Sequence, residues 1–192
     1  MDQSPRASDA PALHRVLHRF FFALKPAPVE ANRIHAFAER TATGARLVQR
    51  AHQHITLAIT DDFQSLPTML VDAMLRAGKM ARAAPFTLTL NRLSLSNRSL
   101  ALRPDGAVPP LATLQRTIAA AMAREGVPMR AGWRFSPHQT LAYRNGAPGG
   151  RAIDGFGWHV EDFVLIHSHV GRTRHEELGR WRLTGGDQLA LF

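Results

Sequence analysis

Apolar and polar residues alternate along several short segments of this chain, which is the pattern of strands with one buried face. Residues 86–93 show it most clearly, since Phe86, Leu88 and Leu90 fall on one face. Residues 99–103 alternate in the same way, and the intervening Asn97-Arg98 predicts a hairpin turn. Apolar runs predict further strands at residues 19–24, 158–170 and 179–183.

Three other segments carry apolar residues at helical spacing. Residues 28–50 begin with Pro28, which suits the first turn of a helix. Residues 63–77 predict a second helix, and Gly78 directly after them can end it. Residues 109–126 predict a third helix with an inward face made of Leu111, Leu114, Ile118, Ala121 and Met122.

The pentapeptide His-x-Thr-Leu-Ala occurs twice, beginning at His54 and again at His138. Both copies fall in predicted strands, at residues 52–60 and 136–144. Side chains two residues apart on a strand point the same way, roughly 7 Å apart, so each copy offers one imidazole and one hydroxyl to a single surface. Two such strands facing each other would hold a phosphate and move protons on both sides of it. The repeat therefore indicates a phosphodiesterase site.

A single His-x-Thr on an apolar strand has a simpler explanation, because a lone histidine there is usually an edge residue or a satisfied core residue. The second copy changes the balance. Both copies follow a polar, turn-like stretch, at residues 50–53 and 134–137, and both continue into Leu-Ala. Matching flanks of this kind favour a shared function.

The order of the predicted elements suggests an α+β protein. It reads strand, helix, motif strand, helix, strand, followed by strand, helix, motif strand and closing strands. We expect two similar lobes of antiparallel sheet flanked by helices, each built round one motif strand, with a central cleft between them. Residues 19–192 are expected to form this single bilobal domain, and residues 1–18 a disordered leader.

Composition narrows the setting of the protein. The 192 residues are 45% hydrophobic, enough for a sizeable core, and they include no cysteine, which excludes disulfides, thiolate metal sites and a cysteine nucleophile. No apolar stretch approaches the roughly 20 residues of a membrane span, and residues 1–11 lack the apolar core of a secretory signal. We therefore expect a cytoplasmic protein without a membrane partner.

The formal net charge is +9, and Lys25 and Lys79 are the only lysines among 24 basic residues. Arginine forks bind phosphate bidentately, so a polyanionic partner is the physical interpretation. A base-composition bias toward arginine codons would produce the same numbers. Charge therefore supports a nucleic-acid partner only weakly.

The two motifs resemble those of the two-histidine phosphoesterase superfamily, and in particular its bacterial RNA 2′,3′-cyclic phosphodiesterase (2′–5′ RNA ligase) branch. The resemblance runs from about Phe20 to Leu183. It is carried by Phe-Phe-Ala-Leu-Lys-Pro at residues 21–26, by the two motifs and their spacing, and by Phe-Val-Leu-Ile-His-Ser at residues 163–168 before a strand containing Trp-Arg-Leu at residues 181–183.

This resemblance implies an enzyme that hydrolyses a terminal RNA 2′,3′-cyclic phosphate to a 2′-phosphate, with reverse 2′–5′ ligation by the same groups. It implies that His54 is the general acid and His138 the general base, although the sequence itself does not decide which is which. Thr56 and Thr140 would donate hydrogen bonds to the phosphate oxygens. The scheme requires no metal and no cofactor.

Other residues near the motifs are candidates for substrate contacts. Tyr143 could stack on a base, and Arg144 and Arg151 could bind phosphate, although solvated surface positions explain the arginines equally well. The expected partners are RNA ends or a small cyclic nucleotide, and the protein is expected to be a monomer.

Three alternatives stay open at this stage. His52-x-His54 and His167-x-His169 each place two imidazoles on one strand face, a spacing found in metal sites, but no carboxylate or third histidine that would complete such a site is evident, so we expect no metal. A non-catalytic RNA-binding module would need charge alone and no paired histidines. A member of the same superfamily that acts on a small cyclic nucleotide or an ADP-ribose cyclic phosphate would use the same mechanism.

Overall fold

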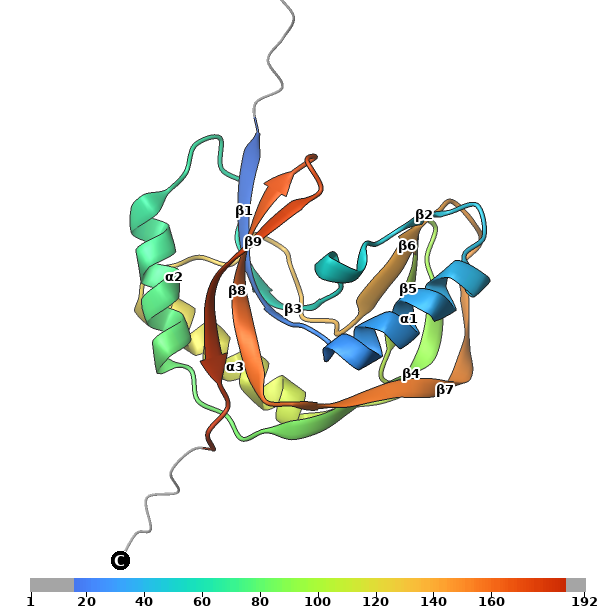
Figure 1. Ribbon diagram of the computed structural model, residues 1–192. Coiled ribbons are helices and arrows are strands. Elements are labelled where there is room, and N and C mark those ends of the chain that lie inside the picture. The colour runs from blue at the N-terminus through green and yellow to red at the C-terminus, as the bar shows by residue number, and fades with distance from the viewer. Residues whose placement is uncertain (1–15, 186–192) are drawn as a thin grey trace, which may run out of the picture.

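The computed structural model describes residues 16–185 of the chain. Within them, antiparallel strands pair in the order β7-β4-β5-β6-β3-β1-β8-β9, with β2 beside β6, and helices flank the sheet (Figure 1). The strands are β1 (Leu17–Leu24), β2 (Arg46–Leu47), β3 (Ile55–Ile59), β4 (Phe86–Leu95), β5 (Ser99–Arg103), β6 (Gln139–Tyr143), β7 (Gly149–Val160), β8 (Asp162–Val170) and β9 (Arg174–Arg182). The helices are α1 (Pro28–Thr41), the short 3₁₀ helix η1 (Arg50–His52), α2 (Thr68–Met80) and α3 (Pro109–Arg124). The α+β prediction is confirmed.

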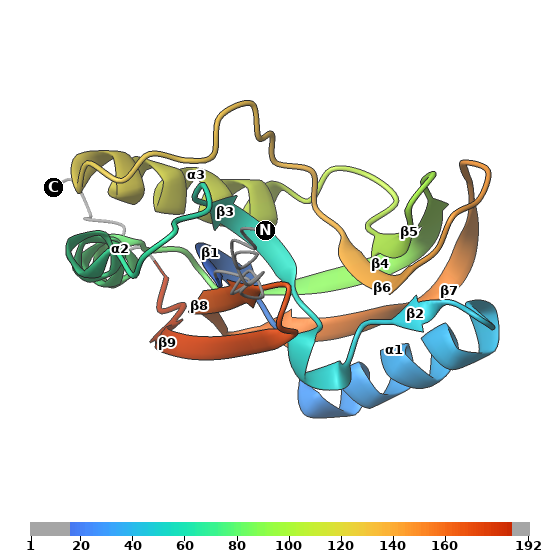
Figure 2. The same cartoon turned by 90° about the horizontal axis from the view of Figure 1, so that it is seen from above.

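The strands divide into two lobes, which Figures 1 and 2 show from perpendicular directions. One lobe consists of β1, β3, β8 and β9, and its outer face is covered by α2 and α3. The other consists of β2 and β4 to β7, with α1 packed against β6 and β7. Each lobe contains one motif strand, as expected. The lobes are not consecutive halves of the chain, however. The first lobe combines β1 and β3 with β8 and β9, and β4 to β7 of the other lobe lie between them in the sequence.

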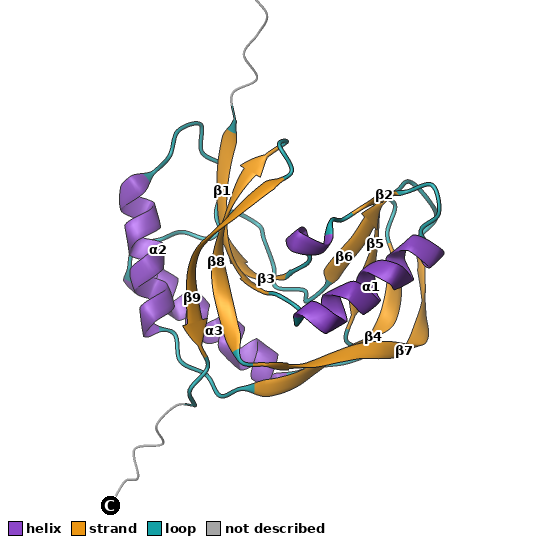
Figure 3. Ribbon diagram, viewed as in Figure 1, coloured by secondary structure: helices purple, strands orange, loops and turns teal. Residues whose placement is uncertain are grey.

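A narrow junction joins the two lobes. β3 and β6 pair only at Ile55 and Gln139, after which the two strands diverge (Figure 3). Beside this pair the Gln139 Nε2 donates a hydrogen bond of 3.2 Å to the Gln53 Oε1, and both side chains are buried. The junction therefore places the two motif histidines, one residue before each strand, on the same side of the sheet.

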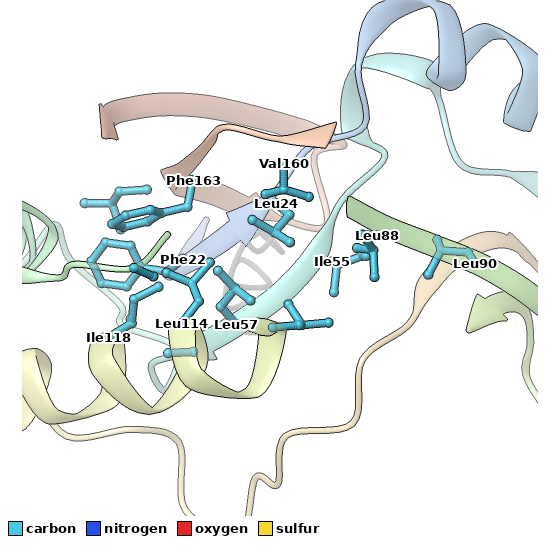
Figure 4. Close-up of a cluster of buried hydrophobic side chains, with 14 of the residues drawn as sticks. Phe22, Leu24, Ile55, Leu57, Leu88, Leu90, Leu114, Ile118, Val160 and Phe163 are labelled. Carbon is cyan, nitrogen blue, oxygen red and sulfur yellow. The ribbon is translucent and has the colours of Figure 1, made fainter. Parts of the chain in front are cut away.

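The main hydrophobic core lies between the sheet and its helices (Figure 4). Alternation predicts its strand contributions correctly, because Phe86, Leu88 and Leu90 are all buried. The predicted face of the third helix is also confirmed in full. Its buried residues are Leu111, Leu114, Ile118, Ala121 and Met122.

The strands of the first lobe also carry a smaller apolar cluster on their opposite face. Phe21 and Ala23 of β1 meet Val164 and Ile166 of β8 there, while the intervening Phe22 belongs to the main core. Alternation along β1 and β8 therefore gives this sheet one face toward α2 and α3 and a second face that is free to build a site.

The first two predicted helices have different boundaries from those expected. The helix predicted for residues 28–50 ends at Thr41, because Gly44 turns the chain with a φ of 76° and β2 follows. The helix predicted for residues 63–77 begins at Thr68, since the backbone of Phe63 exchanges two hydrogen bonds with His18. It then continues through Gly78 to Met80.

Strand boundaries shift as well. The apolar run 158–170 is two strands, β7 and β8, and β7 already begins at Gly149 inside a Gly/Pro-rich segment. The predicted leader extends to residue 18, but β1 starts at Leu17, which pairs with Val170. Residues 1–15 of that leader lie outside the described residues.

None of the helices within residues 16–185 combines the length and the apolar character needed to cross a membrane.

Residue 78 lies within α2 as a glycine, and the Trp181 ring occupies the space where a side chain would be. A Cβ on Gly78 would lie 2.5 Å from that ring, which is itself packed against Phe163 and Phe22. We expect Gly78→Ala to lower the free energy of unfolding by about 1–3 kcal/mol in urea denaturation. The control Gly106→Ala, where nothing lies within 4 Å, should change it by less than about 0.5 kcal/mol. Helix propensity alone predicts the opposite sign for Gly78→Ala, so a stabilised variant would contradict this packing.

Candidate active site

Both motifs open onto one cleft of about 600 Å³ between the lobes. His54 and Thr56 line it from one side, and His138 and Thr140 line it from the other. The structure thus brings together the four residues that the repeat singled out. The predicted strands are shorter than expected, since β3 begins at Ile55 and β6 at Gln139, directly after each histidine.

A β-bulge follows the threonine in each motif. Along β1 and β3 the pairing steps from Phe22 with Ala58 to Ala23 with Thr56, which leaves Leu57 as an extra residue. Along β5 and β6 it steps from Leu100 with Ala142 to Ala101 with Thr140, which leaves Leu141 in the same position. Bulges bend strands and redirect side chains, often beside active sites. The shared Leu-Ala is therefore the part of each motif that buries two consecutive residues in the core.

Backbone carbonyls hold the two histidines in the same orientation. The Nδ1 of His54 lies 2.6 Å from the carbonyl oxygen of His52, and the Nδ1 of His138 lies 2.7 Å from that of Ser136. A carbonyl oxygen only accepts hydrogen bonds, so Nδ1 carries the proton in each ring. In its neutral form, each imidazole with this tautomer keeps its Nε2 lone pair for chemistry, as a general base or a metal ligand requires.

Two aromatic rings pack against His54 in the cleft. Phe21 stacks on it with ring centroids 4.7 Å apart, and His175 meets it edge-on at 5.6 Å. Burial lowers the pKa of His54 to about 4, and the nearby His138, Lys25 and His52 lower it further against the opposing hydrogen bond to the His52 carbonyl. His54 is consequently neutral in the free protein at neutral pH.

His52 and His175 extend this histidine group, with ring centroids 4.4 Å apart. Burial is the main cause that lowers the pKa of His175 to about 3, and the neighbouring His54 and His52 add to it. Burial and Lys25 also lower the pKa of His52. His52 belongs to η1 and not to a motif strand, so the predicted placement of His52 and His54 on one strand face is wrong.

Arginines reach the cleft from its rim. Arg46 of β2 lies over the Tyr143 ring, 4.6 Å from its centroid, which is the geometry of a cation–π contact. Arg19 of β1 also lines the cleft but is bound by two hydrogen bonds to Asp62, at 2.6 and 2.7 Å. Arg46 is therefore the better placed of the two to meet an incoming phosphate.

Of the three candidate substrate contacts, only Tyr143 lies in the cleft, where 46% of its surface is exposed. Arg144 follows it in the chain, where alternation turns its side chain away, and it does not line the cleft. Arg151 lies on β7 at the far edge of the sheet and lines a different pocket together with Arg33 and Arg40. Arg144 and Arg151 thus lie outside the cleft lining, in agreement with the alternative of solvated surface positions.

Sequence reasoning missed several residues of the site. Arg19 and Phe21 had a usable signal, because Phe20 and Phe22 face the core and the alternate positions must face the other way. Arg46 and His175 had none. Arg46 reaches the cleft through the pairing of β2 with the distant β6, and His175 through the pairing of the β8–β9 hairpin with the distant β1.

The chain is similar to known proteins both in sequence and in structure. The family model described as the 2′-5′ RNA ligase superfamily matches residues 25–172, a span that contains both motifs. The Escherichia coli LigT structure complexed with 3′-AMP is similar with a TM-score of 0.70 at 24% identity, covering 88% of this chain and 99% of that one. TT0787 of Thermus thermophilus gives 0.70 at 21% identity, with 87% and 98% covered. These two likenesses show the fold. No curated protein matches the chain significantly.

The buried setting of His54 predicts a specific acid sensitivity. In the folded protein its imidazole should titrate at about 4 by NMR, against about 6.5 in the unfolded chain. The folded state then binds this proton less readily than the unfolded state. The stability contributed by neutral His54 is therefore complete above pH 6.5 and is lost as the pH falls toward 4, by up to about 3 kcal/mol.

Denaturation curves at pH 7 and pH 4.5 test this linkage. His54→Gln should lose less stability between the two pH values than the wild type does. The matched control His159→Gln, at an exposed position on β7, should keep the full loss. An NMR pKa near 6.5 for His54 would contradict the proposed desolvation.

Proposed function

The chain belongs to the 2′-5′ RNA ligase superfamily, and on that basis we propose that it opens RNA terminal 2′,3′-cyclic phosphates to 2′-phosphates without using a metal in the reaction. The observation that carries this proposal is the matched pair of motifs around one cleft. Each motif presents one imidazole Nε2 and one threonine hydroxyl toward the same space. Acid and base groups on opposite sides of a phosphate are what in-line displacement of a ribose oxygen requires.

The proposed step moves one proton at each histidine. A water oxygen attacks phosphorus while the Nε2 of His138 takes a proton from that water. The bond from phosphorus to the 3′ oxygen breaks, and the Nε2–H of His54 protonates this oxygen as it leaves. His138 is then protonated and His54 neutral, and exchange with solvent restores both. If an RNA 5′-hydroxyl replaced water as the nucleophile, the same proton transfers would join it to the phosphorus and release the 3′ oxygen, which is 2′–5′ ligation.

Thr56 and Thr140 complete the phosphate site in this proposal. Their hydroxyls line the cleft two residues beyond the histidines, so they reach the non-bridging oxygens while the imidazoles address the bonds that form and break. Negative charge accumulates on those oxygens in the transition state. Donors placed there in advance stabilise it, typically by a factor of about 10²–10³ for each donor.

The low pKa of His54 adds a condition to its role as the acid. At a pKa of about 4 its imidazole is neutral in the free protein at pH 7 and has no proton to donate from Nε2. A phosphodiester anion bound between the two histidines favours the charged form and raises that pKa. Substrate binding would therefore protonate the Nε2 of His54, whereas in the free protein this nitrogen would be unprotonated.

The rim of the cleft supports a nucleotide as the bound group. Tyr143 offers an exposed ring for a base, and Arg46 lies beside it for a phosphate. Structures of E. coli LigT have been solved with 3′-AMP and with phosphate. We propose that this cleft likewise receives the phosphate end of a nucleotide.

The first test is turnover of a short RNA that ends in a 2′,3′-cyclic phosphate, with the product identified as the 2′- or 3′-phosphate. We expect 2′-phosphate, formed equally well in EDTA. His54→Ala and His138→Ala should each lower kcat/KM by about 10²–10⁴-fold. Thr56→Val and Thr140→Val should each lower it by about 10²-fold.

Circular dichroism of each variant separates lost chemistry from lost folding. Turnover that EDTA abolishes would overturn the metal-independent mechanism. Turnover of a nucleoside 2′,3′-cyclic phosphate without turnover of the RNA would reassign the substrate to small cyclic nucleotides. Full activity in the His138→Ala variant would overturn the two-histidine scheme itself.

Arg46 and Arg151 form a matched pair for testing how the substrate is bound. Arg46→Ala should raise KM by about tenfold with a smaller effect on kcat, because the contact is made at the rim and not at the reacting bonds. Arg151→Ala removes the same charge from a pocket elsewhere and should leave both constants unchanged. Equal effects of the two substitutions would show that overall positive charge, and not the rim contact, binds the substrate.

A further inference from the structure

A second group of histidines lies on the core-facing side of the first lobe's sheet, beyond the end of the hydrophobic core. His18 of β1 pairs in register with His169 of β8, and His167 lies two residues before His169 on the same face. The main-core residues Phe163 and Leu165 precede them on this face of β8. This group joins the His-x-His spacing of the sequence to a third histidine that only strand pairing supplies.

The ring nitrogens of the three histidines are close enough to share one ion. One nitrogen from each lies within 4.8 Å of the other two. The closest pair, His18 Nδ1 and His167 Nε2, is 2.9 Å apart. Nitrogen ligands of a tetrahedral zinc ion at 2.0–2.1 Å are about 3.4 Å from one another. Small side-chain rotations therefore separate the distances seen here from a coordination site.

Glu176 supplies the carboxylate that such sites commonly include. It pairs with His167 across β8 and β9, and its Oε2 lies 3.4 Å from the His167 Nδ1. His167 thus directs Nε2 toward the other histidines and Nδ1 toward a carboxylate, the arrangement that orients a metal-bound imidazole. Arg174 also pairs with Glu176 and helps hold it in place.

One nitrogen of the group has no hydrogen bond in the structure. The Nε2 of His169 is buried, and although a Glu176 oxygen lies 3.3 Å away, the two make no hydrogen bond. A buried nitrogen that has an ion-pair contact but no well-formed hydrogen bond calls for an explanation. An ion held among the three rings would draw the His169 ring toward the other two. It would also replace the hydrogen bond between the His18 Nδ1 and the His167 Nε2.

We propose that His18, His167 and His169 bind a divalent transition-metal ion of the zinc class, with Glu176 orienting the ligands. Imidazole nitrogens suit Zn²⁺, and three of them leave a fourth position for water or the carboxylate. His18 and His169 are only partly buried, which gives the ion a path from solvent. This proposal replaces the expectation that the chain holds no metal.

The role of this ion would be structural. It would tie β1, near the start of the described chain, to β8 and to Glu176 of β9, near its end. The opposite faces of the same strands carry Phe21 and His175, the two rings against His54. Of the three proposed ligands, His169 alone also reaches the lining of the cleft. Binding would hold the strands in register without occupying the space between the motif histidines, so the proposal is independent of the reaction assigned to the cleft.

The test is zinc binding by protein without a polyhistidine tag, measured by elemental analysis after dialysis and by thermal denaturation. We expect one bound zinc per chain and a higher Tm with zinc than with EDTA, as a ligand specific to the folded state produces. The cleft histidines are a second place where zinc could bind. The double variant His54→Ala, His138→Ala should keep the zinc and the Tm increase.

The variants His18→Gln and His169→Gln should lose both, while His159→Gln on β7 should match the wild type. Glu176→Gln should weaken binding by about 10–100-fold. If a ligand variant fails to fold, imidazole NMR of the wild type decides: zinc should shift the resonances of His18, His167 and His169 and leave those of His138 unchanged. Zinc bound only at the cleft histidines, or no zinc bound at all, would overturn the proposal.

Discussion

The junction between β3 and β6 is the constraint on which the rest of this structure depends. The two motif strands meet at one residue pair, Ile55 with Gln139, and the buried hydrogen bond between Gln53 and Gln139 lies directly beside it. Beyond this pair the strands separate into different lobes, and the bulge after each threonine adds to their bending. The hydrophobic core continues between the lobes, so the strands separate on the cleft side while the two lobes stay packed together on the core side. The single contact gives a cleft whose two walls carry equivalent groups.

Equivalent local structure then gives equivalent orientation. Each histidine is held through Nδ1 by the carbonyl two residues before it, and each motif buries its Leu-Ala pair beyond the bulge. The surroundings of the two rings differ, because Phe21 and His175 cover His54 alone. Burial keeps His54 neutral at neutral pH. Two matching motifs thus hold their imidazoles in different surroundings because different side chains pack against each one.

The strands of the first lobe contribute side chains to both faces of their sheet, one toward the core and one toward the cleft. On β1, Phe20 and Phe22 belong to the core, whereas Arg19 and Phe21 line the cleft. On β8, alternation sends Ser168 toward His175 of β9 and the flanking histidines to the opposite face. Because successive side chains point in opposite directions, one short strand can place a ring in the cleft on one face and a histidine of the second cluster on the other. A substitution on either face of these strands therefore affects the backbone that positions the side chains of the other face.

The sequence by itself determined the features that depend on local periodicity. The alternation of residues 86–93, the inward face of α3 and the repeated His-x-Thr-Leu-Ala are all present in the structure, because side-chain direction follows directly from backbone geometry over a few residues. Tertiary structure alone decided which strands share a lobe. It also decided that His175 and Arg46 reach the cleft while Arg144 and Arg151 do not, and that His18 joins His167 and His169. These outcomes depend on register between segments that are far apart in the chain, and no local pattern of hydrophobicity or charge encodes that register.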